Sequence, residues 1–442
     1  MIGGFNPPAA LAAPCDAPVV NKVACENLQP GSDDWKVQSK DEAIVGFTTD
    51  ISTTPGSQVD FKIRTAAKKY HIDIYRLGYY QNKGARYMGT VYRTQPQNQP
   101  ECLRDAATAL IDCGNWAVSV SWTVPPTAVS GVYYAKLHDD DLAAGNDPND
   151  PNASEKWIEH EIVFIVRDDA SNSKILFQTS DSTWAAYNRY GGNSLYFGDG
   201  PGQGGQAYKV SYNRPFTGGD GPEDFVFNAE YPMLKFMERN GYDMSYTTDA
   251  DSARRGNLIK NHKVFLAVGH DEYWSSEQRN NVEAARDAGV HMAFMTGNEI
   301  FWKTKWEPST ASGTSTDWRT VVCYKETKGT QNDGTNTWTG TWRDPRYSPP
   351  QDGGRPENSL LGNIFTVNGH RNDSLEVPSA FGKTRLWRNT AVANLAAGAK
   401  YTFQPGTLGY EWNTVPDNGF QPAGVMQMSQ TTVGLDGAYA LH

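Results

Sequence analysis

The sequence predicts an all-β sandwich followed by an α/β domain in which helices lie on both faces of a mostly parallel sheet. Three observations indicate this order. Short alternating runs separated by Pro, Gly and Asn fill residues 43–167, a polar segment follows, and strand-like runs then alternate with helical ones through residues 168–442. Residues 1–42 precede both parts as an N-terminal extension with a disulfide loop.

The first part contains short runs in which apolar and polar residues alternate, a pattern typical of strands with one buried face. Clear examples lie at residues 59–63, 71–77, 117–122, 131–137 and 161–166. No helical period interrupts them, so we expect two packed sheets. The aspartate-rich loop at 138–154 lacks the glycine and the ligand spacing of an EF-hand, and a solvated insertion explains it better than calcium binding.

After the polar segment, strands alternate with helices, which favours a parallel sheet because parallel strands need long crossover connections. Strands are expected at 175–178, 243–247, 264–268 and 291–295, and helices at 231–240 and 253–260. A further helix begins at a capping box at Ser275 and ends near Gly289. Residues 304–356 resemble an irregular or β-containing insertion, and strands return at 363–367 and 408–411.

The composition argues against two classes of partner. The 442 residues carry 50 Asp and Glu against 40 Lys and Arg, giving a net charge of −10, and no basic segment would follow a phosphate backbone. No run approaches the roughly 18 apolar residues of a membrane span. We therefore expect neither nucleic acid nor a membrane span.

The cysteines indicate an oxidising compartment. Cys15 with Cys25, and Cys102 with Cys113, are spaced for two small disulfide loops, although four reduced thiols are the alternative. Cys323 lies in an apolar stretch and is expected to be a buried thiol. We expect an extracellular, secreted protein, and because the first residues lack the pattern of a signal peptide, such a segment would have been removed before this numbering starts.

Polar side chains follow the ends of three expected strands. His270 and Glu272 come after strand 264–268, Asn298 after strand 291–295, and Tyr187 after strand 175–178. Because ligands of open α/β sheets bind beyond the carboxyl ends of the strands, these residues are candidates for one site. Each also has a structural alternative: a turn hydrogen bond, a salt bridge or aromatic packing. Glu411 lies between two aromatic residues, which suits a general base because burial raises a carboxyl pKa.

At these positions the sequence resembles the large (beta) subunit of N,N-dimethylformamidase and the broader family that shares its C-terminal domain. The matching motifs, as they stand here, are Trp184-Ala185-Ala186-Tyr187-Asn188, Glu230-Tyr231-Pro232, Gly241-Tyr242-Asp243, Gly269-His270-Asp271-Glu272-Tyr273-Trp274, Gly297-Asn298 and Gly409-Tyr410-Glu411. The resemblance implies an amidotransferase-like α/β domain that follows the sandwich in the sequence. The chain is also expected to stop before that domain of the family is complete.

The resemblance further implies one iron ion (Fe³⁺) per chain, held by two tyrosinates and one glutamate. Carried over, Glu272 is the carboxylate ligand, Tyr231 one phenolate and Tyr187 the other, with Tyr190 competing with Tyr187. Phenolate and carboxylate are hard oxygen donors, which suit ferric iron better than zinc or copper.

The same resemblance assigns three further roles. His270 is expected beside the metal, Asn298 as a contact to the substrate or its oxyanion, and Glu411 as the general base. The leading hypothesis is therefore an iron-dependent hydrolase of the C–N bond of a small amide such as a formamide. A small partner subunit or a homo-oligomer is compatible with it.

The alternative hypothesis is a secreted surface, carbohydrate-binding or structural protein built on a hydrolase-like scaffold. It rests on the aromatic-rich N-terminal half with its expected disulfides, and on two glycosylation sequons, at Asn152 and Asn372. In this hypothesis the sandwich binds a glycan or assembles through its strand edges.

Overall fold

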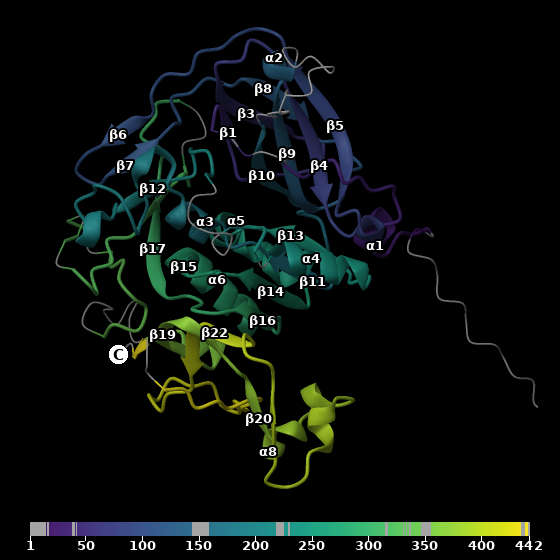
Figure 1. The fold of residues 1–442 in the computed structure, drawn as a ribbon, viewed down its shortest axis with the longest axis vertical. Coiled ribbons are helices and arrows are strands. Elements are labelled where there is room, and N and C mark those ends of the chain that lie inside the picture. The colour runs from purple at the N-terminus through teal and green to yellow at the C-terminus, as the bar shows by residue number, and fades with distance from the viewer. Residues whose placement is uncertain are drawn as a thin grey trace, which may run out of the picture.

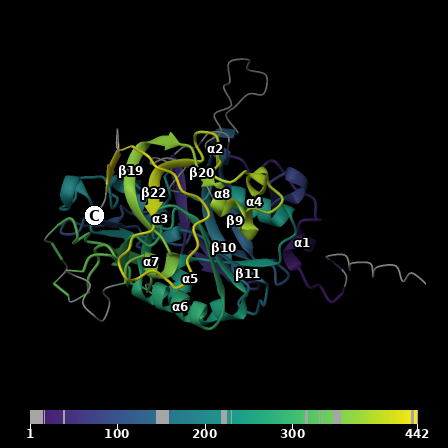
Figure 2. The same cartoon turned by 90° about the horizontal axis from the view of Figure 1, so that it is seen from below.

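The computed structural model describes residues 15–440, apart from 16, 38–39, 41, 144–158, 218–224, 229, 314–316, 330, 333, 336, 346–354 and 435–437. Three layers follow one another in space (Figure 1): the sandwich strands at the top, the α/β elements in the middle and the C-terminal strands at the bottom. Seen from below, the C-terminal strands lie in front of the α/β elements (Figure 2). The sequon at Asn152 lies outside the described residues.

Two sheets form the N-terminal part. One has the order β1 (Ile44–Thr48), β3 (Gln58–Thr65), β8 (Val120–Thr123), and the other the order β2 (Ser52–Thr53), β10 (Glu159–Val166), β9 (Gly131–Asp139), β4 (Tyr70–Leu77), β5 (Ala85–Arg93). All pairs are antiparallel except β10 with β2. Apolar side chains at alternate positions, such as Phe61, Ile72, Ile74 and Phe164, meet in a common core.

Smaller elements flank these sheets. They are α1 (Lys22–Glu26), the pair β6 (Leu103–Asp105) and β7 (Leu110–Asp112), and α2 (Asp140–Ala143). Both expected disulfides, Cys15–Cys25 and Cys102–Cys113, are present, and Cys323 is a free, buried thiol.

A four-stranded parallel sheet forms the middle layer. Its order is β13 (Met244–Thr247), β11 (Ile175–Gln178), β14 (Val264–Gly269), β16 (His291–Thr296), and the helices are α3 (Asp181–Tyr187), α4 (Glu230–Arg239), α5 (Asp249–Arg254) and α6 (Ser276–Asp287). Ser275 caps α6 by accepting a hydrogen bond from the Gln278 backbone N–H, as expected from the capping box.

The expected helix at 253–260 is wrong. The helix α5 begins earlier, because the Thr248 side chain accepts a hydrogen bond from the Asp251 backbone and caps it. It ends at Arg254, and residues Gly256–Asn261 form a separate 3₁₀ helix.

The remaining strands form further sheets around the parallel sheet. A second four-stranded sheet has the order β12 (Lys209–Ser211), β18 (Thr320–Val322), β17 (Trp302–Glu307), β15 (Tyr273–Ser275). The C-terminal strands are β19 (Ile364–Asp373), β20 (Glu376–Pro378), β21 (Lys400–Thr402), β22 (Leu408–Thr414) and β23 (Ala438–Ala440), with short helices α7 (Asn358–Leu361) and α8 (Ser379–Gly382). No helix among the described residues is long and apolar enough to cross a bilayer.

The sandwich is joined to the middle layer by a continuous apolar core, here called the junction core. Along β4, Ile72 and Ile74 face the sandwich interior, whereas Tyr75 and Leu77 belong to the junction core. Its other principal members are Val132, Tyr134, Val163 and Ile165 from the sandwich, and Phe177, Leu234, Tyr246 and Leu266 from the α/β part. The five-stranded sheet is therefore covered on both faces along much of its length.

A buried ion pair lies beside the junction core. Arg76 of β4 donates two hydrogen bonds to Glu238 of α4, with Nη2 2.8 Å from Oε1 and Nη1 3.1 Å from Oε2. Both side chains are fully buried. The Tyr246 hydroxyl and the Asn27 amide also donate to Glu238, at 2.6 and 2.8 Å, so each carboxylate oxygen is well satisfied.

Candidate metal centre

The turn after β14 positions Glu272, the carboxylate of the candidate centre. Gly269 has φ +110°, and a Cβ there would lie 2.7 Å from the Glu230 carboxyl carbon. Only glycine fits this position without strain, because it tolerates positive φ and leaves room for the buried carboxyl group. The chain then passes through His270 and Asp271 to Glu272, at the carboxyl edge of the parallel sheet.

Two tyrosine hydroxyls converge on the Glu272 carboxylate. Tyr187, the last residue of α3, donates to Oε2 at 2.9 Å. Tyr196, from the loop that follows, lies 2.8 Å from Oε1 and 2.7 Å from Oε2. The two rings stack with centroids 4.1 Å apart, and Glu272 is only 3% exposed. Three oxygen-bearing side chains thus meet around a buried carboxylate.

A buried lysine stands against this group. The Lys325 Nζ lies 3.6 Å from the centre of the Tyr196 ring and donates to the Leu195 carbonyl at 2.9 Å. Burial lowers the pKa of Lys325 to about 8. Burial, and then the charge of Glu272, raise the pKa of Tyr196 well above its ordinary value, so the phenol is protonated in this arrangement. The local sequence around Lys325 did not indicate this role.

Beyond Glu272 the site opens toward solvent through His270 and Glu411. The His270 Nε2 lies 3.6 Å from Glu272 Oε2 and 3.5 Å from Glu411 Oε2. The Asn298 amide donates to Glu411 Oε1 at 3.3 Å, and Asn298, two residues beyond the end of β16, adopts φ +49°. The side chains of His270 and Glu411 are 19% and 21% exposed. Glu411 belongs to β22, so a C-terminal strand completes the site.

Two residues of the sequence-based set lie elsewhere. The Tyr231 hydroxyl donates to the Gly84 carbonyl at 3.3 Å, and its ring packs 5.2 Å from Trp35, at the junction with the sandwich. Burial raises the pKa of Tyr231 to about 12. The structure therefore does not bring Tyr231 to Glu272, and Tyr196 takes the place beside Tyr187.

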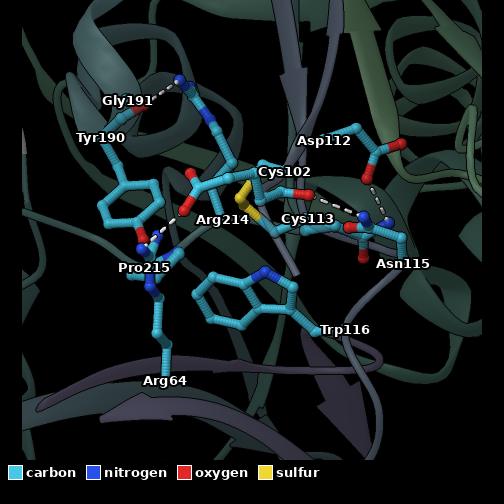
Figure 3. Close-up of a disulfide and its surroundings, with 12 residues drawn as sticks. Arg64, Cys102, Asp112, Cys113, Asn115, Trp116, Tyr190, Gly191, Arg214 and Pro215 are labelled. Atoms are coloured by element: carbon cyan, nitrogen blue, oxygen red, sulfur yellow. Dashed lines mark hydrogen bonds and ion pairs between the residues drawn. A yellow bond between two sulfur atoms is a disulfide. The ribbon is translucent and has the colours of Figure 1, made fainter. Parts of the chain in front are cut away.

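Tyr190 is separated from the centre as well. Its ring packs edge-on against Trp116 at 6.3 Å, near the Cys102–Cys113 disulfide, and Arg64 lies beside its hydroxyl (Figure 3). Of the two alternatives Tyr187 and Tyr190, Tyr187 is the one that contacts Glu272.

A row of buried carboxyl groups lies under the candidate centre. Asp181, Asp249 and Asp271 are fully buried, and Glu299 is 4% exposed. Burial, reinforced by Glu299, raises the pKa of Asp271 well above its ordinary value, and burial raises that of Asp181 to about 6. Because unpaired buried carboxylates are costly, burial favours the protonated form of these carboxyl groups.

The donor set fits a hard cation. A carboxylate and two phenol oxygens meet, and the phenols can release the protons that now point at Glu272. These oxygen donors lie beside the carboxyl ends of the parallel strands, where ligands of open α/β sheets bind. The chain belongs to the N,N-dimethylformamidase beta subunit-like, C-terminal family, whose model matches residues 71–439.

The family match begins inside the sandwich and continues through β22, so it includes every residue of the candidate centre. No curated protein matches the chain. Among solved structures, Cwp6 from Clostridium difficile shows 10% identity over 58% of this chain and 37% of that chain, with a TM-score of 0.13. A family 123 glycoside hydrolase from Clostridium perfringens shows 9% identity over 56% of this chain and 67% of that chain, with a TM-score of 0.12.

Proposed function

We propose that this chain is an iron(III)-dependent hydrolase of the C–N bond of a small amide such as a formamide. The observation that carries the proposal is the convergence of the Tyr187 and Tyr196 hydroxyls on the Glu272 carboxylate. Family membership supports the same reaction class and favours it over a surface or carbohydrate-binding role. The two disulfides support an extracellular location.

Tyr187, Tyr196 and Glu272 would hold the iron. Bound there, iron(III) would act as a Lewis acid on the amide carbonyl. Two phenolates and one carboxylate would balance its three positive charges, which lowers the cost of burying the ion. The ammonium of Lys325 against the Tyr196 ring favours the phenolate form, because a cation stabilises a nearby anion.

The open side of the site supplies the proton transfers. Glu411 and His270 lie 3.5 Å apart, so either can take a proton from a water molecule placed between them and the substrate carbon. The Asn298 amide, oriented by Glu411, can donate a hydrogen bond to the oxygen on which negative charge develops. The stacked tyrosine pair and buried Glu272 form the opposite side of the site.

The test combines iron analysis with a visible spectrum. We expect about one iron per chain and a tyrosinate-to-iron charge-transfer band in the unaltered protein. Tyr196→Phe should shift this band and weaken iron retention at least about tenfold, and Glu272→Gln should lose the iron. Tyr231→Phe is the matched control, because it removes a partly buried tyrosine hydroxyl outside the centre.

Activity is measured as amine released from dimethylformamide and other small amides. Glu411→Gln should keep the iron and the band but lower kcat by about 10²-fold or more, because a general base is lost. A protein that takes up no iron, or a Tyr231→Phe variant that loses the band while Tyr196→Phe keeps it, would contradict the assignment.

A further inference from the structure

A second cluster of possible metal ligands lies on the sandwich, away from the candidate centre. His71 and Asp73 are two residues apart on β4, so their side chains point to the same face of the sheet. His138 of β9 is the register partner of His71. All three lie on the face that further along β4 carries Tyr75 of the junction core. Strand alternation and register thus bring two imidazoles and one carboxylate together.

The two imidazoles present the same nitrogen to one oxygen. Asp73 Oδ2 lies 3.7 Å from His71 Nε2 and 3.4 Å from His138 Nε2. The rings stack, with centroids 4.4 Å apart and an angle of 10° between their planes. The three ligand atoms lie within 4.8 Å of one another. After side-chain rotations, each of these three atoms could lie about 2.0–2.2 Å from one zinc ion, the usual zinc-to-ligand distance.

Each imidazole is held from its other side by a carboxylate. His71 Nδ1 lies 2.6 Å from Asp140 Oδ1, and His138 Nδ1 lies 3.3 Å from Glu159 Oε1. A carboxylate at Nδ1 keeps the proton there and leaves the Nε2 lone pair available, which is the arrangement that supports histidine ligands of metals. The remaining oxygen of Asp73, Oδ1, accepts a hydrogen bond from Thr90.

The buried His138 Nε2 is an independent sign of a ligand position. This atom is shielded from solvent and makes no hydrogen bond of good geometry among the described residues. A buried ring nitrogen without a well-aligned partner, aimed at the Asp73 carboxylate, is the position that a bound cation would fill.

The charges around the cluster suit a divalent cation. Asp73, Asp140 and Glu159 face it, and the cation beside them is Lys136, which lies opposite Asp73. The Lys136 Nζ is bound by Glu159 Oε1 at 2.9 Å and by two backbone carbonyl oxygens at 2.9 and 3.0 Å. With neutral imidazoles, the carboxylates leave an excess of negative charge.

We propose that His71, Asp73 and His138 form a binding site for a divalent transition-metal ion, of which Zn²⁺ fits the donor set best. Two imidazole nitrogens and one carboxylate oxygen are common zinc ligands, and they differ in kind from the all-oxygen set around Glu272. The three side chains are 22%, 20% and 13% exposed, so a water molecule can occupy the fourth position. The proposal does not depend on the proposed hydrolase function.

The experiment measures zinc affinity by competition with a chromophoric chelator, using the full chain freed of metal. It is performed on the unaltered protein and on Glu272→Gln, so that the candidate centre cannot supply the signal. We expect one tight Zn²⁺ site in both. Asp73→Asn and His138→Ala should weaken it at least about tenfold, whereas His291→Ala, which removes an exposed histidine, should not.

Two further readouts keep the result decisive. Co²⁺ substituted at the site should give visible bands typical of nitrogen and oxygen ligands, and these should disappear in Asp73→Asn, the variant of nearly unchanged shape. Zn²⁺ should raise the Tm of the unaltered protein and of His291→Ala but not that of Asp73→Asn. Equal zinc affinity in the unaltered protein and Asp73→Asn, or loss of binding only in Glu272→Gln, would overturn the proposal.

Discussion

Arg76→Met should destabilise the protein strongly, because Arg76 and Glu238 form a fully buried ion pair between the sandwich and α4. The substitution keeps much of the side-chain volume but removes both hydrogen bonds to Glu238, at 2.8 and 3.1 Å. Glu238 would then hold a buried carboxylate whose remaining donors are Tyr246 and Asn27.

The expected magnitude follows from this geometry. Breaking one partner of a buried pair typically costs about 3–5 kcal/mol, because the other charge stays buried without compensation. Glu238→Gln leaves the Arg76 charge buried without its carboxylate partner, so its cost should be similar. The double variant buries no unpaired charge, so its loss should be smaller than the sum of the two single losses by about 1–3 kcal/mol.

The assay is urea unfolding followed by the fluorescence of the 13 tryptophans, with free energies of unfolding compared at one pH. Arg64→Met is the matched control, since the Arg64–Glu101 pair is 42% and 82% exposed and should contribute at most about 1 kcal/mol. If Arg76→Met costs no more than Arg64→Met, or if the double variant is additive, the reasoning is refuted.

Two further substitutions test the turn beside the candidate centre. Burial raises the pKa of Glu230 to about 7 from 4.5, so the folded chain binds a proton that the unfolded chain releases, and stability should fall as pH rises between these values. Glu230→Gln should remove this dependence, which is on the order of 2–3 kcal/mol, and parallel pH profiles of the two proteins would contradict it. Gly269→Ala should cost roughly 1–3 kcal/mol and displace Glu272, weakening iron binding, whereas Gly289→Ala, at φ +96° with open space around it, should lose stability alone. Equal iron affinity in the two alanine variants would argue against this role of Gly269.

Local signals in the sequence predicted much of the secondary structure. The strand at Ile175–Gln178 and the helix capped by Ser275 were both expected, because periodicity and capping residues act over a few positions. The helix α5 was misplaced because three of its five buried residues are polar, which hides the apolar period, and because the cap at Thr248 was overlooked. The buried Asp249, for example, is satisfied by Ser182 and Gln278, which are distant in sequence and leave no local signature.

The candidate centre was predictable only in part, for the same reason. Glu272, His270 and Asn298 follow strand ends, and the edge of a parallel sheet gathers such residues. Tyr196 comes from an irregular loop whose path depends on tertiary packing, so nothing near it in sequence marked it. Tyr231 was placed by its motif, but the start of α4 faces Trp35 at the junction with the sandwich.

The junction core makes the N-terminal sandwich a poor candidate for cutting out or exchanging. In an isolated sandwich, the five-stranded sheet would expose Tyr75 and Tyr134 to water, and Arg76 would lack its partner Glu238. An excised sandwich should therefore aggregate, and a chimera with a foreign sandwich should fail unless α4 is transplanted with it. Within the family, the sandwich and the α/β part are expected to be inherited together, because the junction core makes them fold as one unit.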